Sequence, residues 1–169
     1  MAIQGATRAE DETTHGASTR KTKVPLSKWI ARCIHPVDVT ALDRSPEDIV
    51  CLVDDDPSVL KSTERLLDSG GFSVRAFSRS EEFLVYATSH QVPLVVLDIW
   101  MEHITGLEVL ARLCALSPLT RVIVITGRDD LAARVTAMQI GLVAFFTKPL
   151  NEDEFLTAVH DGLRLAKGL

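Results

Sequence analysis

The sequence has 169 residues, of which 46% are hydrophobic and 24% are charged, and its net charge is −5. This length suits one ordinary domain, and the composition excludes a largely disordered chain. The acidic balance argues against direct nucleic-acid binding, because proteins that bind the phosphate backbone normally carry a basic face. The start MAIQGATRAEDETT lacks the apolar core of a signal peptide, and no apolar stretch is long enough to span a membrane, so we expect a cytoplasmic protein.

The cysteines fit the same expectation. Cys33, Cys51 and Cys114 are scattered without CxxC spacing, which predicts neither a disulfide framework nor a zinc site. This usage is typical of a reducing compartment.

Residues 1–47 read as a flexible N-terminal extension, since residues 1–23 show no hydrophobic period. Trp29, Ile30, Cys33 and Ile34 then recur at helical spacing beside Lys28 and Arg32. Prolines 25 and 36 confine this segment to a length at which an isolated helix is unstable, so we interpret it as weakly folded. The alternative is a short docking or membrane-surface helix.

Residues 48–168 form the predicted folded domain, in which five apolar runs of strand length alternate with amphipathic segments. Continuous apolar runs are typical of strands that are buried on both faces. The predicted strands are 49–53, 73–77, 93–98, 121–126 and 143–147.

Helix-start and helix-stop signals separate these strands. The predicted starts are Asp56 before Pro57, Ser80, the Thr105–Glu108 capping box, Asp129, and Asn151 with Glu154; Gly70-Gly71 and Gly141 are stops. Five strands alternating with five helices through short loops predict parallel strands with right-handed crossovers. The expected class is therefore an α/β doubly wound sheet with helices on both faces.

Polar side chains follow four of the five strands, at the edge where such sheets bind ligands. Asp54 and Asp55 follow the first strand, Asp98 closes the third, Thr126 closes the fourth and Lys148 follows the fifth. Clustered carboxylates repel one another unless a cation compensates, and carboxylates are Mg²⁺ ligands. A lysine and a hydroxyl opposite them would hold phosphoryl oxygens, and one carboxylate could act as a nucleophile that forms an acyl phosphate.

The chain resembles the receiver domains of two-component response regulators. The resemblance is carried by VDDDPSV (53–59), LDIWMEHITGLEVL (97–110), VITG (124–127) and FFTKPL (145–150), in this order and spacing. It implies a flavodoxin-like, five-stranded parallel sheet with strand order 2-1-3-4-5 and five helices.

Residue by residue, the resemblance implies that Asp98 is the phosphoacceptor. Asp55 would be a direct Mg²⁺ ligand, Asp54 would act largely through water, and the backbone carbonyl of Trp100 would be the third protein ligand. The resemblance further implies that Thr126 is the switch hydroxyl, Lys148 the phosphate-binding lysine, Phe145 the aromatic switch residue, and Lys148–Pro149 a cis bond.

Three positions depart from the common pattern. Glu102 follows Met101 where many members have proline, which predicts a more mobile loop or an additional carboxylate near the site. Trp100 and Arg128 occupy positions that, in this family, tune the lifetime of the phosphoryl group. Phe145 lacks the hydroxyl that a tyrosine would offer to a partner.

The expected function is a phosphoacceptor in a two-component phosphorelay. A sensor histidine kinase or a histidine phosphotransfer protein would donate to Asp98, and at most slow self-dephosphorylation is expected, so we do not expect an enzyme. The helix after Asp129, the strand 143–147 and the helix after Asn151 would form the surface read by an output protein or by a second copy. Leu131, Val135 and Leu142 are candidates for it, although core packing is favoured for Val135.

Two alternatives remain. The chain ends after the last predicted helix, which fits either a stand-alone receiver or a transcriptional regulator that lacks its DNA-binding output domain. A Mg²⁺-dependent aspartyl phosphatase would require Asp-x-Asp-x-Thr/Val after the first strand, and Ser58 fails at the fifth position.

Overall fold

Five parallel strands form one sheet in the computed structural model, which describes residues 49–168. The strand order is β2-β1-β3-β4-β5, as the resemblance implied. Each neighbouring pair is parallel, so the carboxyl ends of all strands lie at one edge. The strands are β1 (Ile49–Val53), β2 (Ser73–Phe77), β3 (Leu94–Asp98), β4 (Arg121–Thr126) and β5 (Ala144–Thr147).

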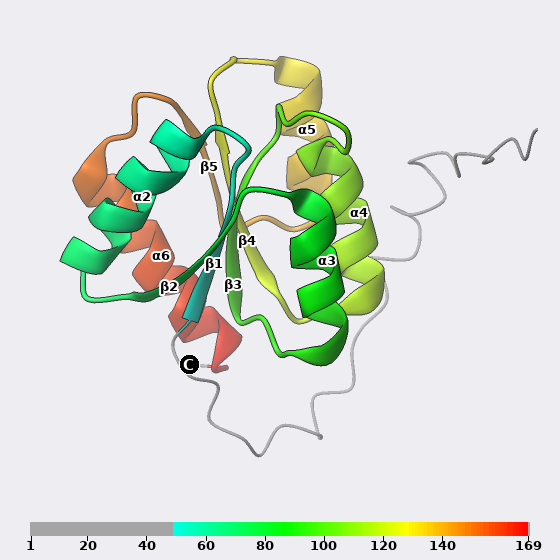
Figure 1. The fold of residues 1–169 in the computed structure, drawn as a ribbon, viewed down its shortest axis with the longest axis horizontal. Coiled ribbons are helices and arrows are strands. Elements are labelled where there is room, and N and C mark those ends of the chain that lie inside the picture. Colours follow the sequence, from blue (N-terminus) through cyan, green and yellow to red (C-terminus); the bar gives the residue numbers. More distant parts are fainter. Residues whose placement is uncertain (1–48, 169) are drawn as a thin grey trace, which may run out of the picture.

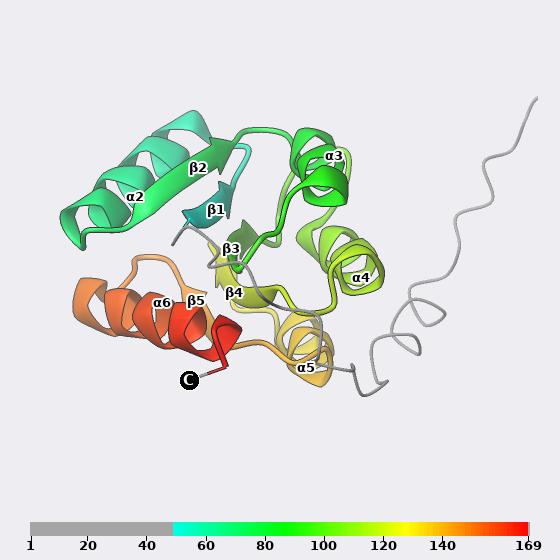
Figure 2. The same ribbon diagram turned by 90° about the horizontal axis from the view of Figure 1, so that it is seen from below.

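Five helices alternate with the strands and cover both faces of the sheet. Helices α2 and α6 lie on one face, and α3, α4 and α5 lie on the other (Figures 1 and 2). The helices are α2 (Pro57–Ser69), α3 (Ser80–Ser89), α4 (Gly106–Leu116), α5 (Leu131–Gln139) and α6 (Glu152–Ala166). The predicted doubly wound α/β architecture is confirmed, and within residues 49–168 no helix is long and apolar enough to cross a membrane.

Two hydrophobic layers follow from the two-residue period of the strands. Val95 and Leu97 of β3 belong to the layer under α3, α4 and α5, whereas Leu94 and Val96 belong to the layer under α2 and α6. Every residue of β3 is buried, which explains its uninterrupted apolar sequence. Cys51 of β1 lies in the first layer, and burial raises the pKa of its thiol to about 12 although Arg75 opposes this shift. Cys51 forms no disulfide.

Three of the predicted helix starts are confirmed. Asp56 accepts hydrogen bonds from the N–H groups of Ser58 and Val59. Thr105 and Glu108 form a reciprocal capping box, and Asn151 accepts from the N–H of Glu154.

Two predicted starts are wrong by one residue. Arg79 occupies the cap position of α3 without a side-chain hydrogen bond, and Ser80 is the first helical residue, where it is buried. Asp130, not Asp129, caps α5 by accepting from the N–H groups of Ala132 and Ala133. The N–H of Asp130 bonds to the carbonyl of Arg128, and this turn keeps Asp129 outside the helix.

The predicted extension 1–47, including the segment around Trp29 and Cys33, lies outside the described residues and stays a prediction.

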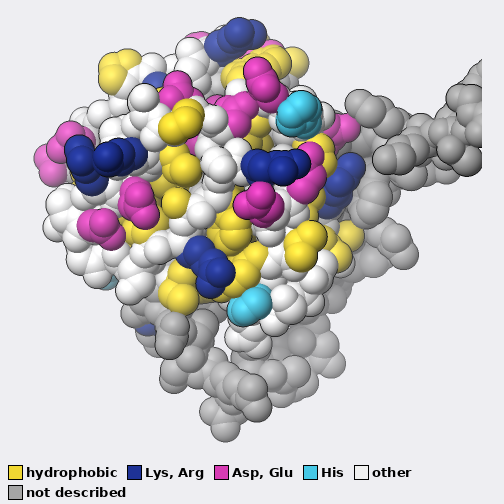
Figure 3. All heavy atoms as spheres, viewed as in Figure 1, with side chains coloured by type: hydrophobic (Ala, Val, Ile, Leu, Met, Phe, Trp, Pro, Cys, Tyr) yellow, Lys and Arg dark blue, Asp and Glu magenta, His cyan; other side chains and the backbone are white. Residues whose placement is uncertain are grey.

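On the face of the domain seen in Figure 3, basic and acidic side chains are interspersed, and neither sign gathers in one area.

Candidate functional site

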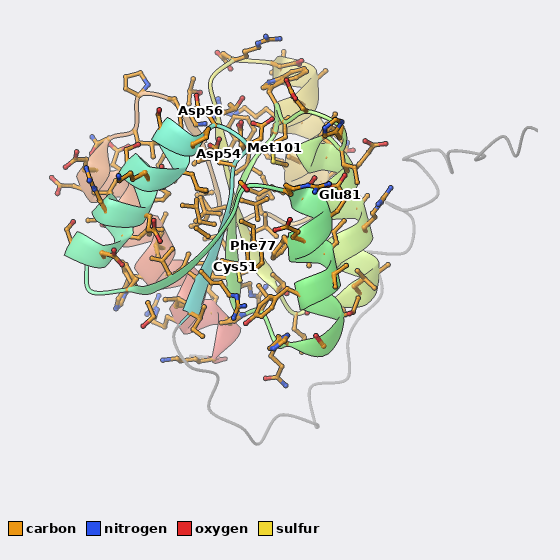
Figure 4. All side chains as sticks on the ribbon, viewed as in Figure 1. Cys51, Asp54, Asp56, Phe77, Glu81 and Met101 are labelled. Carbon is orange, nitrogen blue, oxygen red and sulfur yellow. The ribbon has the colours of Figure 1, made fainter. Side chains whose placement is uncertain are left out.

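Three carboxylates meet at the carboxyl edge of the sheet. Asp54 and Asp55 follow β1, and Asp98 is the last residue of β3; one ligand atom from each lies within 4.8 Å of the others. Figure 4 shows Asp54 and Asp56 at this end of the molecule, with Met101 of the loop after β3 near them. The structure therefore brings together the three aspartates that the sequence singled out.

Lys148 supplies the positive charge of the cluster. Its Nζ lies 2.7 Å from Asp54 Oδ2 and 3.7 Å from Asp98 Oδ2. Asp54 is fully buried, and its other oxygen accepts a hydrogen bond from the N–H of Asp56. The main partner of the Asp54 carboxylate is thus an ammonium group 94 residues away in the sequence.

Asp98 is the least satisfied of the three carboxylates. Its side-chain Oδ1 is buried and has no hydrogen-bond partner among the residues that the structure describes. Burial raises the pKa of Asp98 to about 6; Lys148 opposes this rise and the neighbouring Asp54 adds to it. A buried carboxylate with one free oxygen, next to a lysine, is suited to act as a nucleophile or a metal ligand.

The donor set fits a hard divalent cation. Three carboxylates face one ammonium group, so the cluster has an excess of negative charge that a cation would neutralise. Oxygen ligands of this kind are preferred by Mg²⁺. The ligand role of the Trp100 carbonyl stays a prediction.

Thr126 lies at the end of β4, beside the cluster, and is buried. Its hydroxyl donates to the carbonyl of Arg128 at 3.1 Å and accepts from the N–H of the same residue at 3.2 Å. The Thr126 hydroxyl is therefore hydrogen-bonded to the loop that follows β4. The residue types in the sequence did not indicate these two bonds.

Trp100 and Arg128 join the loops that follow β3 and β4. The Arg128 guanidinium lies 5.2 Å from the centre of the Trp100 ring, a cation–π distance. Both residues are exposed, so the stacked pair lies on the surface of the carboxyl edge.

The region expected to switch is less tightly packed than the cluster. Phe145 is half-buried, with the Arg134 guanidinium 5.2 Å from its ring centre, and the Lys148–Pro149 bond is cis, as the resemblance implied. The prediction that Val135 packs in the core is wrong, because this residue is 47% exposed. Ala133 and Ala137 are buried in its place, because α5 turns their side of the helix inward.

Leu131 and Met138 lie exposed with Val135 along α5, whereas Leu142 is partly buried against the core. We call Leu131, Val135 and Met138 the α5 stripe.

Gly106 shapes the site and was missed by the sequence analysis. A Cβ at this position would lie 2.1 Å from the backbone oxygen of Asp98, so only glycine lets α4 begin against the end of β3. A glycine directly after a good helix cap, where alanine is the better helix former, is the signal that could have revealed it.

The comparisons with known proteins agree with this geometry. Residues 50–160 match the family model described as "Response regulator receiver domain". The chain belongs to this family.

Similar proteins include response regulators of known sequence or structure. The response regulator protein TodT of Pseudomonas putida strain F1 is 36% identical over 118 residues, which are 70% of this chain and 52% of that protein. A CheY-like receiver domain from Methanospirillum hungatei JF-1 has a TM-score of 0.67 and 27% identity, over 73% of this chain and 98% of the other. A response regulator from Burkholderia pseudomallei, solved with a phosphorylated aspartic acid, a calcium ion and citrate, has a TM-score of 0.61 and 26% identity over 72% and 71% of the two chains.

The chain spans about half the length of the curated relatives it matches.

Proposed function

We propose that this chain is a phosphoacceptor that takes a phosphoryl group onto Asp98 from a sensor histidine kinase or a histidine phosphotransfer protein. The observation that carries the proposal is the buried, unpartnered Oδ1 of Asp98, which lies beside Lys148 and two further carboxylates. The phosphorylated aspartic acid of the similar Burkholderia protein supports the same chemistry.

Asp54, Asp55 and Asp98, with the Trp100 carbonyl, would hold Mg²⁺, as the acidic donor set allows. When bound, this ion neutralises negative charge on the phosphoryl group during transfer. Receiver domains have an acidic pocket of this kind, and the calcium ion in the Burkholderia protein is a divalent cation of similar ligand preference.

The transfer itself is a substitution at phosphorus. A carboxylate oxygen of Asp98 forms the new O–P bond, the N–P bond of the donor phosphohistidine breaks, and the histidine nitrogen keeps the electron pair. Lys148 stabilises the charge on the phosphoryl oxygens from its position 3.7 Å from Asp98. The reaction consumes one phosphohistidine for each phosphoaspartate, so the chain is a reactant and not an enzyme with turnover.

Loss of the phosphoryl group requires water to reach the acyl phosphate. The Trp100–Arg128 pair lies at the exposed surface of this edge, where it would limit that access. We therefore expect self-dephosphorylation to be slow.

Switching would start at Thr126. To bond a phosphoryl oxygen, its hydroxyl must give up the hydrogen bond to the Arg128 carbonyl, which frees the loop before α5. Phe145 would turn inward, and the surface formed by α5, β5 and α6 would change its population of conformations. An output protein or a second copy of the chain would read that surface.

A labelling experiment tests the proposal. Acetyl phosphate with Mg²⁺ should add one phosphoryl group to the wild-type chain, seen as a mass increase, and the acid-labile product should be absent from Asp98→Asn. Lys148→Ala should be labelled weakly and should not show the spectroscopic change that accompanies switching. Equal labelling of wild type and Asp98→Asn would refute Asp98 as the acceptor.

A further inference from the structure

We propose that the backbone N–H of Glu102 is a positioning group for the cation site, because it holds the carboxylate of Asp55 in its ligating orientation. This inference rests on the proposed Mg²⁺-dependent function. It concerns a residue at which this chain departs from the common pattern, since a proline at position 102 would have no N–H to donate.

The contact is short and joins two loops that are distant in the sequence. The Glu102 N–H donates to Asp55 Oδ2 with an N···O distance of 2.6 Å across 47 residues. The Glu102 side chain is exposed, and its carboxylate is not part of the cluster of three aspartates. The backbone of Glu102, and not the additional carboxylate anticipated from the sequence, is therefore what contacts the site.

The loop is bent in a way that costs energy and presents this N–H. The carbonyl of Glu102 accepts a hydrogen bond from the N–H of Ile104 at 2.8 Å, which closes a γ-turn around His103. His103 has a φ of 67°, and no other non-glycine residue in the described part of the chain has a positive φ. Strained residues of this kind are maintained where the surrounding structure fixes them and often serve a site.

Both ends of the turn are fixed. Met101, before it, is buried, and after it the N–H of Gly106 donates to the carbonyl of Ile99 at 2.9 Å. The direction of the Glu102 N–H is therefore set by packing on one side and by a backbone hydrogen bond on the other.

Fewer hydrogen bonds orient the carboxylate of Asp55 than that of Asp54. The two oxygens of Asp54 are bound by Lys148 and by the N–H of Asp56. Asp55 is only half-buried, and within residues 49–168 the Glu102 N–H is the one hydrogen-bond donor to its side chain. Its Oδ1 and the remaining lone pairs of Oδ2 stay available for a cation.

A ligand that is already oriented loses less conformational freedom when it binds a cation. Hydrogen bonds from outside the ligand set orient metal-binding side chains, and their loss typically weakens metal binding about 10- to 100-fold. The Glu102 N–H should therefore strengthen Mg²⁺ binding through Asp55.

The test compares Glu102→Pro with Glu102→Ala. Both variants lack the carboxylate, so the difference between them does not come from the side-chain charge; it comes from the N–H and the backbone restriction that proline adds. Titration of each metal-free protein with MgCl₂ in a calorimeter should give a dissociation constant about 10-fold larger for Glu102→Pro than for Glu102→Ala. Equal constants, or tighter binding by Glu102→Pro, would overturn the inference. A wild-type chain that binds no Mg²⁺ at millimolar concentration would instead overturn the cation site on which the inference rests.

A second measurement applies if Glu102→Pro does not fold. In the amide NMR spectrum of the wild-type chain, the Glu102 proton should be shifted downfield and should exchange slowly with solvent, as expected for a short bond to a carboxylate. Both features should be lost in Asp55→Ala. A Glu102 amide signal that is the same in the two proteins would contradict the contact.

Discussion

Strands β3 and β5 belong to one sheet, yet they are packed very differently. All five residues of β3 are buried, whereas three residues of β5 are half-buried and Thr147 is exposed. Two helices on one face of the sheet repeat the contrast: α4, directly after β3, buries five residues, whereas α5, directly before β5, buries only Ala133 and Ala137. The proposed acceptor thus lies at the end of a fully buried strand, whereas the proposed aromatic switch residue, Phe145, lies in a strand with no fully buried residue.

This difference suggests a division of roles. A carboxylate that accepts a phosphoryl group must keep a fixed geometry, and the close packing around β3 would resist its displacement. A surface that changes its population of conformations needs two arrangements of similar energy, which loose packing allows. Four predictions test whether the two regions differ in this way.

The largest effect is expected where α4 meets the end of β3. Gly106→Ala would place a methyl group 2.1 Å from the Asp98 backbone oxygen, and the backbone must move to relieve the clash. We expect a loss of about 4 kcal/mol in the free energy of unfolding, measured by urea denaturation. Gly127→Ala, at the same edge of the sheet but with open space around it, is the matched control and should change the stability little.

Asp54→Asn should have the next largest effect. It removes the charge that faces Lys148 at 2.7 Å and leaves a partly buried ammonium group with a more distant partner. We expect a loss of about 3 kcal/mol by the same measurement. A variant as stable as the wild type would show that this ion pair does not hold the β5 loop to the rigid half of the sheet.

Asp98→Asn should act in the opposite direction and should depend on pH. Because the pKa of Asp98 is raised from 3.8 to about 6, the folded protein binds the proton more tightly than the unfolded chain, and wild-type stability falls as the pH rises from about 4 to 6. The substitution should therefore raise the free energy of unfolding by about 2 kcal/mol at pH 7.5 without Mg²⁺, and the gain should vanish near pH 4.

Thermal or urea unfolding at both pH values measures this gain. Asp68→Asn, which changes an exposed carboxylate of α2, is the control and should show no such gain. A gain for Asp98→Asn that is the same at pH 4 and pH 7.5 would contradict the burial of an ionisable acceptor.

The smallest effect is expected in the α5 stripe. Val135→Ser should change the free energy of unfolding by less than about 0.5 kcal/mol, because the side chain is already 47% exposed. Leu97→Ala in β3 should cost about 3 kcal/mol in the same assay and provides the contrast. If the two variants lost similar amounts of unfolding free energy, α5 and β3 would not differ in how tightly they are packed.

Much of the fold could be predicted because its signals are local. Apolar runs located the five strands to within one residue, and Asp56, Thr105 and Asn151 marked helix starts correctly. The two wrong starts fall where adjacent residues compete: serines flank Arg79, and Asp129 and Asp130 are equally good caps. Val135 was misjudged because an apolar spacing identifies a stripe but does not say that the alanines of α5 face the sheet.

The site, too, could be predicted only in part. Its side chains could be identified from the residues at the strand ends, since parallel strands place those ends at one edge. The contacts made by backbone atoms could not, because the Glu102 N–H and the Arg128 carbonyl belong to no particular residue type. The pairing of Lys148 with Asp54 also required coordinates, because spacing alone does not say which of three carboxylates a lysine prefers.

Arg128 contacts two residues of the proposed site, one through its backbone and one through its side chain. Its backbone is bonded to the hydroxyl of Thr126, and its guanidinium stacks on the indole of Trp100. A displacement of Thr126 that breaks these bonds would therefore also shift the guanidinium that lies over the Trp100 ring. Under the proposed function, substitutions at Arg128 would therefore change both the switching of the output surface and the lifetime of the phosphoryl group.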